Sequence, residues 1–151
     1  MGLEASDEAV DRAVRLAVLE DDLSRLGDGL GSMVGTRGVT LSGGQVQRAA
    51  AARMFVRTPD LLVFDDASSA LDVHTEHTFW ERMFASGAHT CLAVSHRLEA
   101  YRRADQILLI DDGRIVARGD LRTLLRDSPI FREVWRETLH AHAQDPASAA
   151  A

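Results

Sequence analysis

Residues 61–66 read LLVFDD, an apolar run that ends in two aspartates. The four apolar residues before Asp65 and Asp66 predict a buried strand of a parallel sheet, because such strands are covered on both faces. A second apolar run, TCLAVS at 90–95, ends at His96 and predicts another strand of this kind. Ligands bind beyond the carboxyl ends of parallel strands, so these polar residues mark a candidate site.

Helices are predicted on both sides of the first strand. The segment from Gly44 to Arg57 contains the helix-forming run AAAARM, with Ser42 near its amino end, and Pro59 stops it. Another helix is predicted over 73–85. The alternation of strands and helices favours an α/β fold, with a parallel sheet and flanking helices.

The amino-terminal part predicts one long helix and a turn-rich connection. Apolar residues recur at helical spacing from Ser6 to Leu26, and Ser6 can cap this helix. We interpret the acidic group at 20–22 as a solvated face. The glycines of the connection at 27–40 are spaced for turns and do not form a phosphate-binding fingerprint.

The carboxy-terminal part predicts helices around a β-hairpin. The turn signal is Asp111-Asp112-Gly113, which separates two short apolar strands. The final residues, DPASAAA, are expected to be disordered. The predicted elements are a helix at 97–103, strands at 107–110 and 114–117, and helices at 121–126 and 129–141.

Composition excludes several classes of protein. A net charge of −6 gives no electrostatic basis for binding nucleic acid or lying on an anionic membrane. The single cysteine, Cys91, excludes an internal disulfide framework, and its apolar neighbours predict a buried structural thiol. No apolar run approaches the ~20 residues that span a bilayer, and the acidic start is no secretory signal. We therefore expect a cytoplasmic protein that reaches a membrane only through partners.

The two aspartates suit a magnesium site. Magnesium prefers oxygen ligands and takes one or two carboxylates together with phosphates. Asp65 would hold the ion directly or through water, and Asp66 would face the attacking water as a base or orienter. In the competing interpretation both residues only cap the following turn.

The segment LSGGQ at 41–45 suits phosphate binding. Its two glycines allow close approach of the backbone to a ligand, and free N–H groups at a helix start attract phosphate. Ser42 can add a hydroxyl donor. Alone, SGG is equally common in a loop before a helix. His96 could hydrogen-bond a phosphate oxygen or the attacking water, although a lone histidine is more often structural.

In combination and in this order, LSGGQVQR, LLVFDD, SSALD and SHR resemble the second half of the ABC (ATP-binding cassette) ATPase domain, over about Leu16 to Phe131. VGTRGVTLSGGQ and SSALD are most similar to exporter-type members. The resemblance implies an incomplete P-loop NTPase-type parallel sheet. It assigns residues 1–57 to the ABC α-helical subdomain, 58–141 to the carboxy-terminal part of the ATPase core, and 142–151 to a disordered tail.

The resemblance also implies site residues. Asp65 ends the Walker B strand and faces magnesium, Asp66 occupies the catalytic glutamate position, and His96 matches the switch histidine. Ser69 and Asp72 belong to the D-loop at the dimer seam. The signature motif would bind the γ-phosphate of ATP held by the opposing subunit through Ser42, Gly43, Gly44 and Gln45.

Two departures from the family pattern matter. Asp66 replaces the usual glutamate, which draws the carboxylate back by about an ångström, and such misplacement can cost ~10²-fold in rate. A shifted backbone could compensate for the shorter side chain. The second departure is that no G-x-x-x-x-G-K-[ST] is present, and all 17 basic residues are arginine. Since P-loop amides and lysine normally hold the phosphates, we expect weak or undetectable ATP binding by these residues alone.

The missing P-loop also affects the expected sheet. In the resembled fold its strand lies between the strands at 90–95 and 107–110, so a gap with unpaired backbone groups is expected there. Each buried unpaired group costs about 1–3 kcal/mol, against about 5–15 kcal/mol of total stability. We therefore expect the chain alone to be marginally stable or dependent on a partner fragment.

Three hypotheses for function follow. The first is a fragment of the ATP-hydrolysing component of an ABC transporter, which uses ATP and Mg²⁺. Its partners would be a second ABC ATPase domain, the transporter membrane domains and a separately encoded amino-terminal half, at the cytoplasmic face of the membrane. The second is a non-catalytic module that docks on an intact ABC ATPase subunit. The third is an inert gene remnant.

Overall fold

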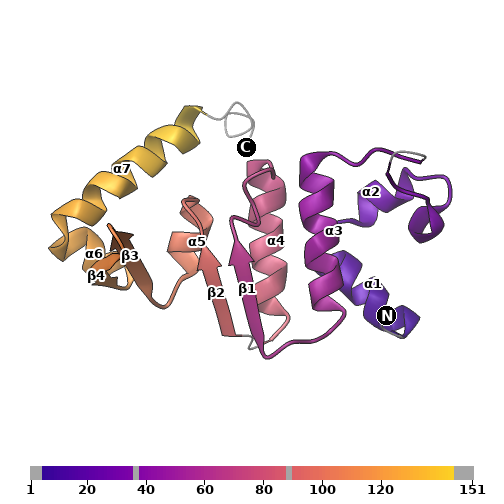
Figure 1. The fold of residues 1–151 in the computed structure, drawn as a ribbon, viewed down its shortest axis with the longest axis horizontal. Coiled ribbons are helices and arrows are strands. Elements are labelled where there is room, and N and C mark those ends of the chain that lie inside the picture. The colour runs from indigo at the N-terminus through magenta and orange to yellow at the C-terminus, as the bar shows by residue number, and fades with distance from the viewer. Residues whose placement is uncertain (1–4, 36–37, 88–89, 145–151) are drawn as a thin grey trace. The chain divides into compact units, whose positions relative to one another are not determined.

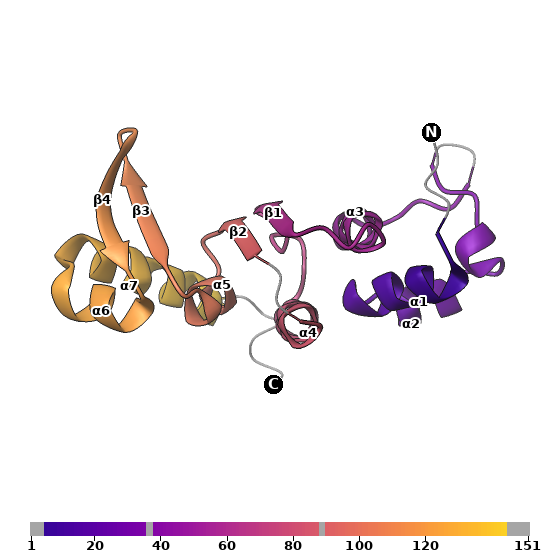
Figure 2. The same cartoon turned by 90° about the horizontal axis from the view of Figure 1, so that it is seen from below.

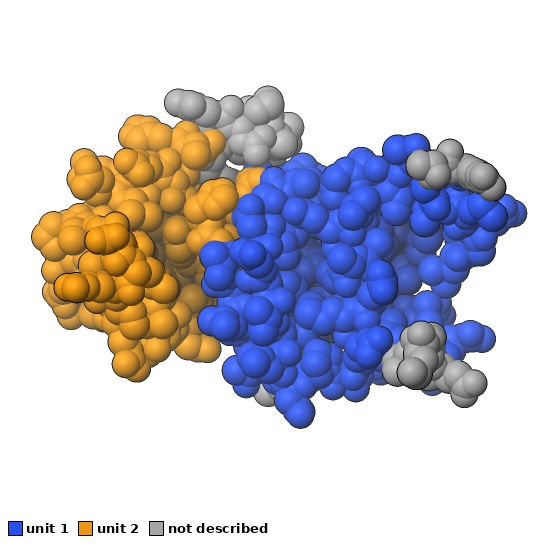
Figure 3. All heavy atoms as spheres, in the orientation of Figure 1, with its two compact units in different colours: residues 1–94 blue, residues 95–151 orange. Residues whose placement is uncertain are grey.

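The computed structural model describes residues 5–35, 38–87 and 90–144, without the side chains at 142 and 144. The chain forms two compact units, Met1–Val94 and Ser95–Ala151, which are coloured separately in Figure 3. Each unit has buried apolar side chains of its own. Within the described ranges, none of the helices combines the length and the apolar character needed to span a bilayer.

The first unit is a mixed helix and strand structure (Figure 1). The predicted helix at 73–85 is confirmed with the same bounds, and the one at 44–57 is confirmed with slightly different ends. The described elements of this unit, in chain order, are α1 (Asp7–Leu16), α2 (Glu20–Ser24), the 3₁₀ turn η1 (Gly29–Gly31), α3 (Gly43–Phe55), β1 (Leu61–Asp65), α4 (Val73–Ala85) and β2 (Thr90–Val94).

The prediction of one helix from Ser6 to Leu26 is wrong, because the chain breaks between α1 and α2. Val18 adopts a φ of +56°, a left-handed conformation that is rare for a β-branched residue. The amide of Leu19 donates to the Val14 carbonyl at 3.1 Å, and that of Val18 donates to the Arg15 carbonyl at 3.1 Å. These two bonds form a Schellman-type helix end.

Strands β1 and β2 form a parallel pair, as predicted. Their register runs from Leu61 opposite Thr90 to Asp65 opposite Val94. Helix α4 connects the two strands and lies against one face of the pair, as Figure 2 shows. The side chains of β1 that face α4, including Phe64, are buried. The crossover places both carboxyl strand ends at one edge of the sheet.

The opposite face of this pair is exposed. Leu61, Val63, Leu92 and Val94 are respectively 50%, 57%, 56% and 62% exposed. The prediction that both strands are buried on two faces is therefore wrong for the described residues. Cys91 is half-buried instead of fully buried, and this burial raises the pKa of its thiol. A parallel sheet is normally covered on both faces, so these four residues form an uncovered apolar face.

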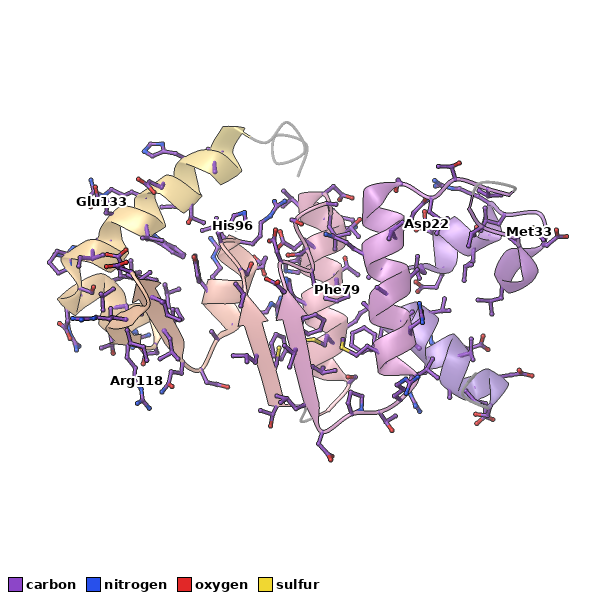
Figure 4. All side chains as sticks on the ribbon, viewed as in Figure 1. Asp22, Met33, Phe79, His96, Arg118 and Glu133 are labelled. Atoms are coloured by element: carbon purple, nitrogen blue, oxygen red, sulfur yellow. The ribbon has the colours of Figure 1, made fainter. Side chains whose placement is uncertain are left out.

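Aromatic side chains form the core between α3, β1 and α4. The ring of Phe79 lies 5.9 Å from Phe55, 6.0 Å from Phe64 and 5.5 Å from Trp80, measured between centroids. Phe79 is labelled in Figure 4, where it lies among these elements. All four residues are at most 5% exposed. This cluster fixes the distance between α3 and the strand end that carries Asp65.

The second unit is built around the predicted hairpin. Asp112 and Gly113 both have positive φ, at +45° and +71°, as a two-residue type I′ turn requires. Ile107, Leu124 and Phe131 form its buried cluster. The described elements are α5 (Leu98–Arg103), β3 (Ile107–Asp111), β4 (Arg114–Gly119), α6 (Leu121–Asp127) and α7 (Pro129–Gln144).

Helix α7 extends three residues beyond the predicted end at 141. The predicted disordered tail therefore begins too early at 142, and its remaining part, 145–151, lies outside the described residues. The strands within the described ranges form two two-stranded sheets, β1 with β2 and β3 with β4. Among the described residues β2 pairs with β1 alone.

Truncation of the core aromatic ring tests this packing. We expect Phe79→Ala to lower the free energy of unfolding by about 3–5 kcal/mol, because it removes a large ring from a closed cluster. Phe84→Ala on the same helix is the control, since Phe84 is 41% exposed. Urea unfolding followed by circular dichroism measures both. Equal losses in the two variants would contradict the assigned core.

Candidate functional site

Asp65 and Asp66 lie at the carboxyl end of β1, beside the end of β2. Asp65 is opposite Val94 in the register, and the amide of Asp66 donates to the Val94 carbonyl at 2.9 Å. The Asp65 side chain is exposed and that of Asp66 is partly buried. Asp66 has a φ of +50°, a left-handed conformation that aspartate tolerates better than most residues. An aspartate at this position therefore suits its backbone.

The loop after Asp66 is fixed by hydrogen bonds within itself and to α4. The amide and hydroxyl of Ser69 donate to the Asp66 carbonyl at 3.2 and 2.9 Å. The hydroxyl of Ser68 donates to Oε1 of Glu76 at 2.7 Å, and both side chains are buried. Serine and glutamate are rarely buried without such a partner. This bond anchors the loop to the first turns of α4.

Asp72 ends the loop as the N-cap of α4. Its carboxylate accepts from the amide of Thr75 at 2.9 Å and from the Thr75 hydroxyl at 2.7 Å. Partial burial alone would raise the pKa of Asp72, but the hydrogen bonds from Thr75 outweigh it and hold the pKa below its usual value. In this unit Asp72 therefore acts as a charged helix cap.

Helix α3 begins with a capping box. The hydroxyl of Ser42 accepts from the Gln45 amide at 3.2 Å, and Oε1 of Gln45 accepts from the Ser42 amide at 2.8 Å. Such a reciprocal pair satisfies two donors at a helix start. Ser42 was predicted near the amino end of this helix, and its cap position confirms this. The capping role of the Gln45 side chain was not foreseen.

The first turn of α3 packs directly on the loop after β1. A Cβ at Gly44 would lie 2.7 Å from the Ala70 carbonyl oxygen, a distance that real side chains do not occupy. At Gly43 the nearest atom would be the Ala70 Cβ at 3.6 Å, an ordinary contact. Gly44 is therefore required by packing, whereas Gly43 has space for a methyl group. LSGGQ and SSALD thus meet within the first unit.

Asp22 is a contributor to this site that the sequence analysis missed. Its Oδ1 accepts from Nε2 of Gln45 at 2.7 Å, and its Oδ2 pairs with the guanidinium of Arg48. Figure 4 labels Asp22 between α2 and α3. The interpretation of residues 20–22 as a solvated face is wrong for Asp22, whose side chain is only 18% exposed. Glu20 pairs with Arg82 at 2.6 Å but stays 37% exposed. A separation of 26 residues between Asp22 and Arg48 left no sequence signal.

Gln47 is the second residue that was missed. Its side chain contacts the loop after β1 from α3, through Ser69 and Ala70. Its amide supplies both a donor and an acceptor to this loop. The sequence places Gln47 two residues after LSGGQ, but no periodicity indicates its partner.

His96 belongs to the second unit and follows β2 by two residues. Its side chain is exposed. The preceding hydroxyl, Ser95 Oγ, accepts from the Arg97 amide at 3.1 Å. The first unit thus brings together the residues predicted from LSGGQ, DD and SALD, while His96 lies in the segment that opens the second.

Comparisons with known proteins identify this combination. No protein-family model matches the chain. The mitochondrial iron-sulfur clusters transporter ATM1 of Candida glabrata is 38% identical over 138 residues, which are 89% of this chain and 19% of that protein. The ATM1-type heavy metal exporter of Novosphingobium aromaticivorans is 41% identical over 132 residues, 87% of this chain and 22% of the exporter. The mycobactin import ATP-binding/permease protein IrtB of Mycobacterium tuberculosis is 39% identical over 134 residues, 88% of this chain and 23% of IrtB.

The solved structure of a bacterial Atm1-family ABC exporter with ATP bound superimposes with a TM-score of 0.80 at 39% identity. The superposition covers 88% of this chain and 23% of the exporter chain. This chain matches a segment of Atm1-type ABC exporters, and the resemblance to an exporter-like ABC transporter fragment is confirmed. The chain spans about a fifth of the length of the curated ABC relatives that it matches. The predicted ABC-type fold class is confirmed.

The glycine pair of the ABC segment gives a matched stability test. We expect Gly44→Ala to lower the free energy of unfolding by about 1–3 kcal/mol, because the added methyl group meets the backbone of Ala70. Gly43→Ala should be neutral or stabilise by up to about 1 kcal/mol. Thermal unfolding of both variants measures the difference. Equal stability would show that α3 does not approach the loop this closely.

The partly buried carboxylate of Asp22 on α2 gives a second test. Asp22→Asn removes the charge that pairs with Arg48 and should destabilise the unit by about 1.5–3 kcal/mol, the range for hydrogen bonds to charged groups. The neighbouring variant Asp21→Asn is the control, since Asp21 is exposed. Urea midpoints at low and high salt measure the loss. If both variants unfold at the same midpoint, Asp22 has no special role.

Proposed function

We propose that this chain supplies the signature helix and the Walker B strand end of an ABC transporter ATPase, and that it hydrolyses ATP only together with a P-loop-bearing segment. The observation that carries the proposal is the close packing of the LSGGQ turn on the loop after Asp65 and Asp66, which Gly44 permits. A site assembled from both motifs needs this fixed distance. Such preorganisation is what phosphoryl transfer mainly requires from a protein.

The strand end would serve hydrolysis. Asp65 is exposed at a carboxyl strand end, and its hard oxygen donors suit Mg²⁺. When bound, this ion would neutralise charge on the ATP phosphates. Asp66 would orient or deprotonate the attacking water. His96, at the end of the neighbouring strand, would hydrogen-bond a phosphate oxygen or that water.

The signature turn would bind phosphate held by a second ATPase domain. The amides at the start of α3 precede its first intrahelical bond, and such groups attract anions. Ser42 holds its hydroxyl at this end as the cap. We assign the trans-acting phosphate contacts to Ser42, Gly43, Gly44 and Gln45. Ser69 and Asp72 would lie at the seam between the two ATPase domains.

The phosphates must be held by residues outside these 151, because the sequence contains no lysine for a P-loop. The uncovered apolar face formed by Leu61, Val63, Leu92 and Val94 supports the same conclusion, since contiguous exposed apolar surface marks an interaction site. The segment that carries the P-loop would cover this face. Whether that segment is joined to this chain or encoded separately, residues 1–57 would belong to the helical subdomain and 58–141 to the ATPase core.

The remaining partners would be those of an ABC transporter. We propose a second ABC ATPase domain at the signature turn and membrane domains that hold the assembly at the cytoplasmic face of a membrane. ATP and Mg²⁺ would be used by the assembled site. The lack of lysine also favours one alternative, a non-catalytic module that docks on an intact ABC ATPase subunit and changes its turnover.

The test compares the chain alone with the chain plus a P-loop-bearing amino-terminal ABC segment. We expect weak or undetectable binding of labelled ATP with Mg²⁺ to the chain alone, and turnover only in the mixture. Asp66→Asn should lower kcat by about 10²–10⁴-fold, and asparagine tolerates the same left-handed backbone. Asp60→Asn, an exposed residue just before β1, is the matched control.

Two results would contradict this function. One is tight ATP binding by the chain without the added segment. The other is full turnover of the mixture with Asp66→Asn, which would separate this strand end from hydrolysis. A change in the turnover of an intact ABC ATPase subunit, without turnover by this chain, would support the docking module.

A further inference from the structure

Gln47 connects α3 to the loop after β1 through both ends of its side-chain amide. Its Nε2 donates to the hydroxyl of Ser69 at 2.9 Å, and its Oε1 accepts from the amide of Ala70 at 3.1 Å. Nε2 also lies 3.5 Å from the Asp66 carbonyl oxygen, at the limit of a hydrogen bond. One side chain on the signature helix therefore contacts Asp66, Ser69 and Ala70 in the loop that begins at Asp66.

The helix geometry explains why this position can reach the loop. Residues three and four apart lie on one face of a helix, so Gln47 shares a face with Gly43 and Gly44. The lack of a side chain at Gly44 lets the helix approach the Ala70 carbonyl closely. At that distance the Gln47 amide spans the remaining gap. A side chain without both a donor and an acceptor could not replace these bonds.

The contact acts at a backbone conformation that needs support. Asp66 has a φ of +50°, and residues in this region persist when their surroundings fix them. Its carbonyl accepts from the amide and the hydroxyl of Ser69, and Gln47 holds that same hydroxyl. This backbone conformation sets the direction in which the Asp66 side chain leaves the main chain. Gln47 thus reaches the reacting group through Ser69.

We propose that Gln47 is a positioning residue for Asp66, which joins the signature helix to the catalytic strand end as one rigid body. The proposal rests on the proposed function only in treating the Asp66 carboxylate as the reacting group. Glu76 on α4 holds the same loop through the hydroxyl of Ser68. Hydrogen bonds from two helices, α3 and α4, therefore hold the loop between β1 and α4. Of these two sets of bonds, the one from α3 comes from a residue next to the signature motif.

The first experiment uses the 151-residue chain and the variant Gln47→Met, which keeps the length of the side chain and removes its polar atoms. NMR hydrogen exchange should show the Ala70 amide exchanging at least about 10-fold faster, because its acceptor is lost. The carbon shifts of Asp66, which report its backbone angles, should change as well. Gln106→Met in the second unit is the matched control. In this variant we expect the Ala70 exchange rate and the Asp66 carbon shifts to keep their wild-type values.

A second variant keeps the test decisive if Gln47→Met folds poorly. Ser69→Ala removes the same contact from the loop side, and the double variant completes a cycle. We expect each single variant to change the Asp66 shifts and the double variant to add little to either. Unchanged Asp66 shifts in both folded single variants, or simple additivity in the cycle, would overturn the proposal.

The kinetic experiment uses the mixture with the P-loop-bearing segment. Gln47→Met should lower kcat by up to about 10²-fold with KM for ATP nearly unchanged, since it misplaces Asp66 without removing a nucleotide contact. If Asp66→Asn abolishes turnover and Gln47→Met leaves kcat unchanged, the role of Gln47 is refuted and the proposed function stands. If Asp66→Asn leaves turnover intact, the proposed function fails, and the exchange of Ala70 still decides whether Gln47 holds the loop.

Discussion

The first turn of α3 lies so close to the loop after β1 that a Cβ at Gly44 would come within 2.7 Å of the Ala70 carbonyl oxygen. This approach requires a glycine, and it requires polar partners for the backbone groups brought together there. The Ser42–Gln45 capping box satisfies the helix end, and the Gln47 amide satisfies the loop. The aromatic cluster around Phe79 packs on both α3 and β1 and so helps to hold the helix at this distance from the strand end. Helix and strand end therefore behave as one piece.

Much of this arrangement could be predicted because its signals are local. Asp72 caps α4, and this helix has the predicted bounds. The Asp112-Gly113 turn specifies the hairpin through two positive φ angles. Parallel pairing of the two apolar strands follows from the helix that connects them. In each case the deciding residues lie within a few positions of the element that they fix.

The parts that could not be predicted depend on long-range contacts or on unusual residues at common positions. Val18 adopts the left-handed conformation at the end of α1, a position that is usually occupied by glycine. Because valine is apolar, the helical spacing of apolar residues continues past this helix end, and the sequence gives no sign of the break. Asp22 finds its partner Arg48 only when α2 and α3 pack together. Leu92 and Val94 are exposed because no other described element packs on their face of the sheet. The sequence of a strand alone does not indicate whether a second layer covers it.

The chain thus carries a well-formed strand end and LSGGQ turn beside an uncovered apolar face, and it matches about a fifth of its relatives' length. The most direct measurement is the change in amide chemical shifts of the labelled chain, assembled with an unlabelled P-loop-bearing segment, when ATP and Mg²⁺ are added. We predict shifts concentrated at 42–45 and 65–72. Shifts elsewhere, with both of these segments unchanged, would contradict the assignment of a nucleotide site to them.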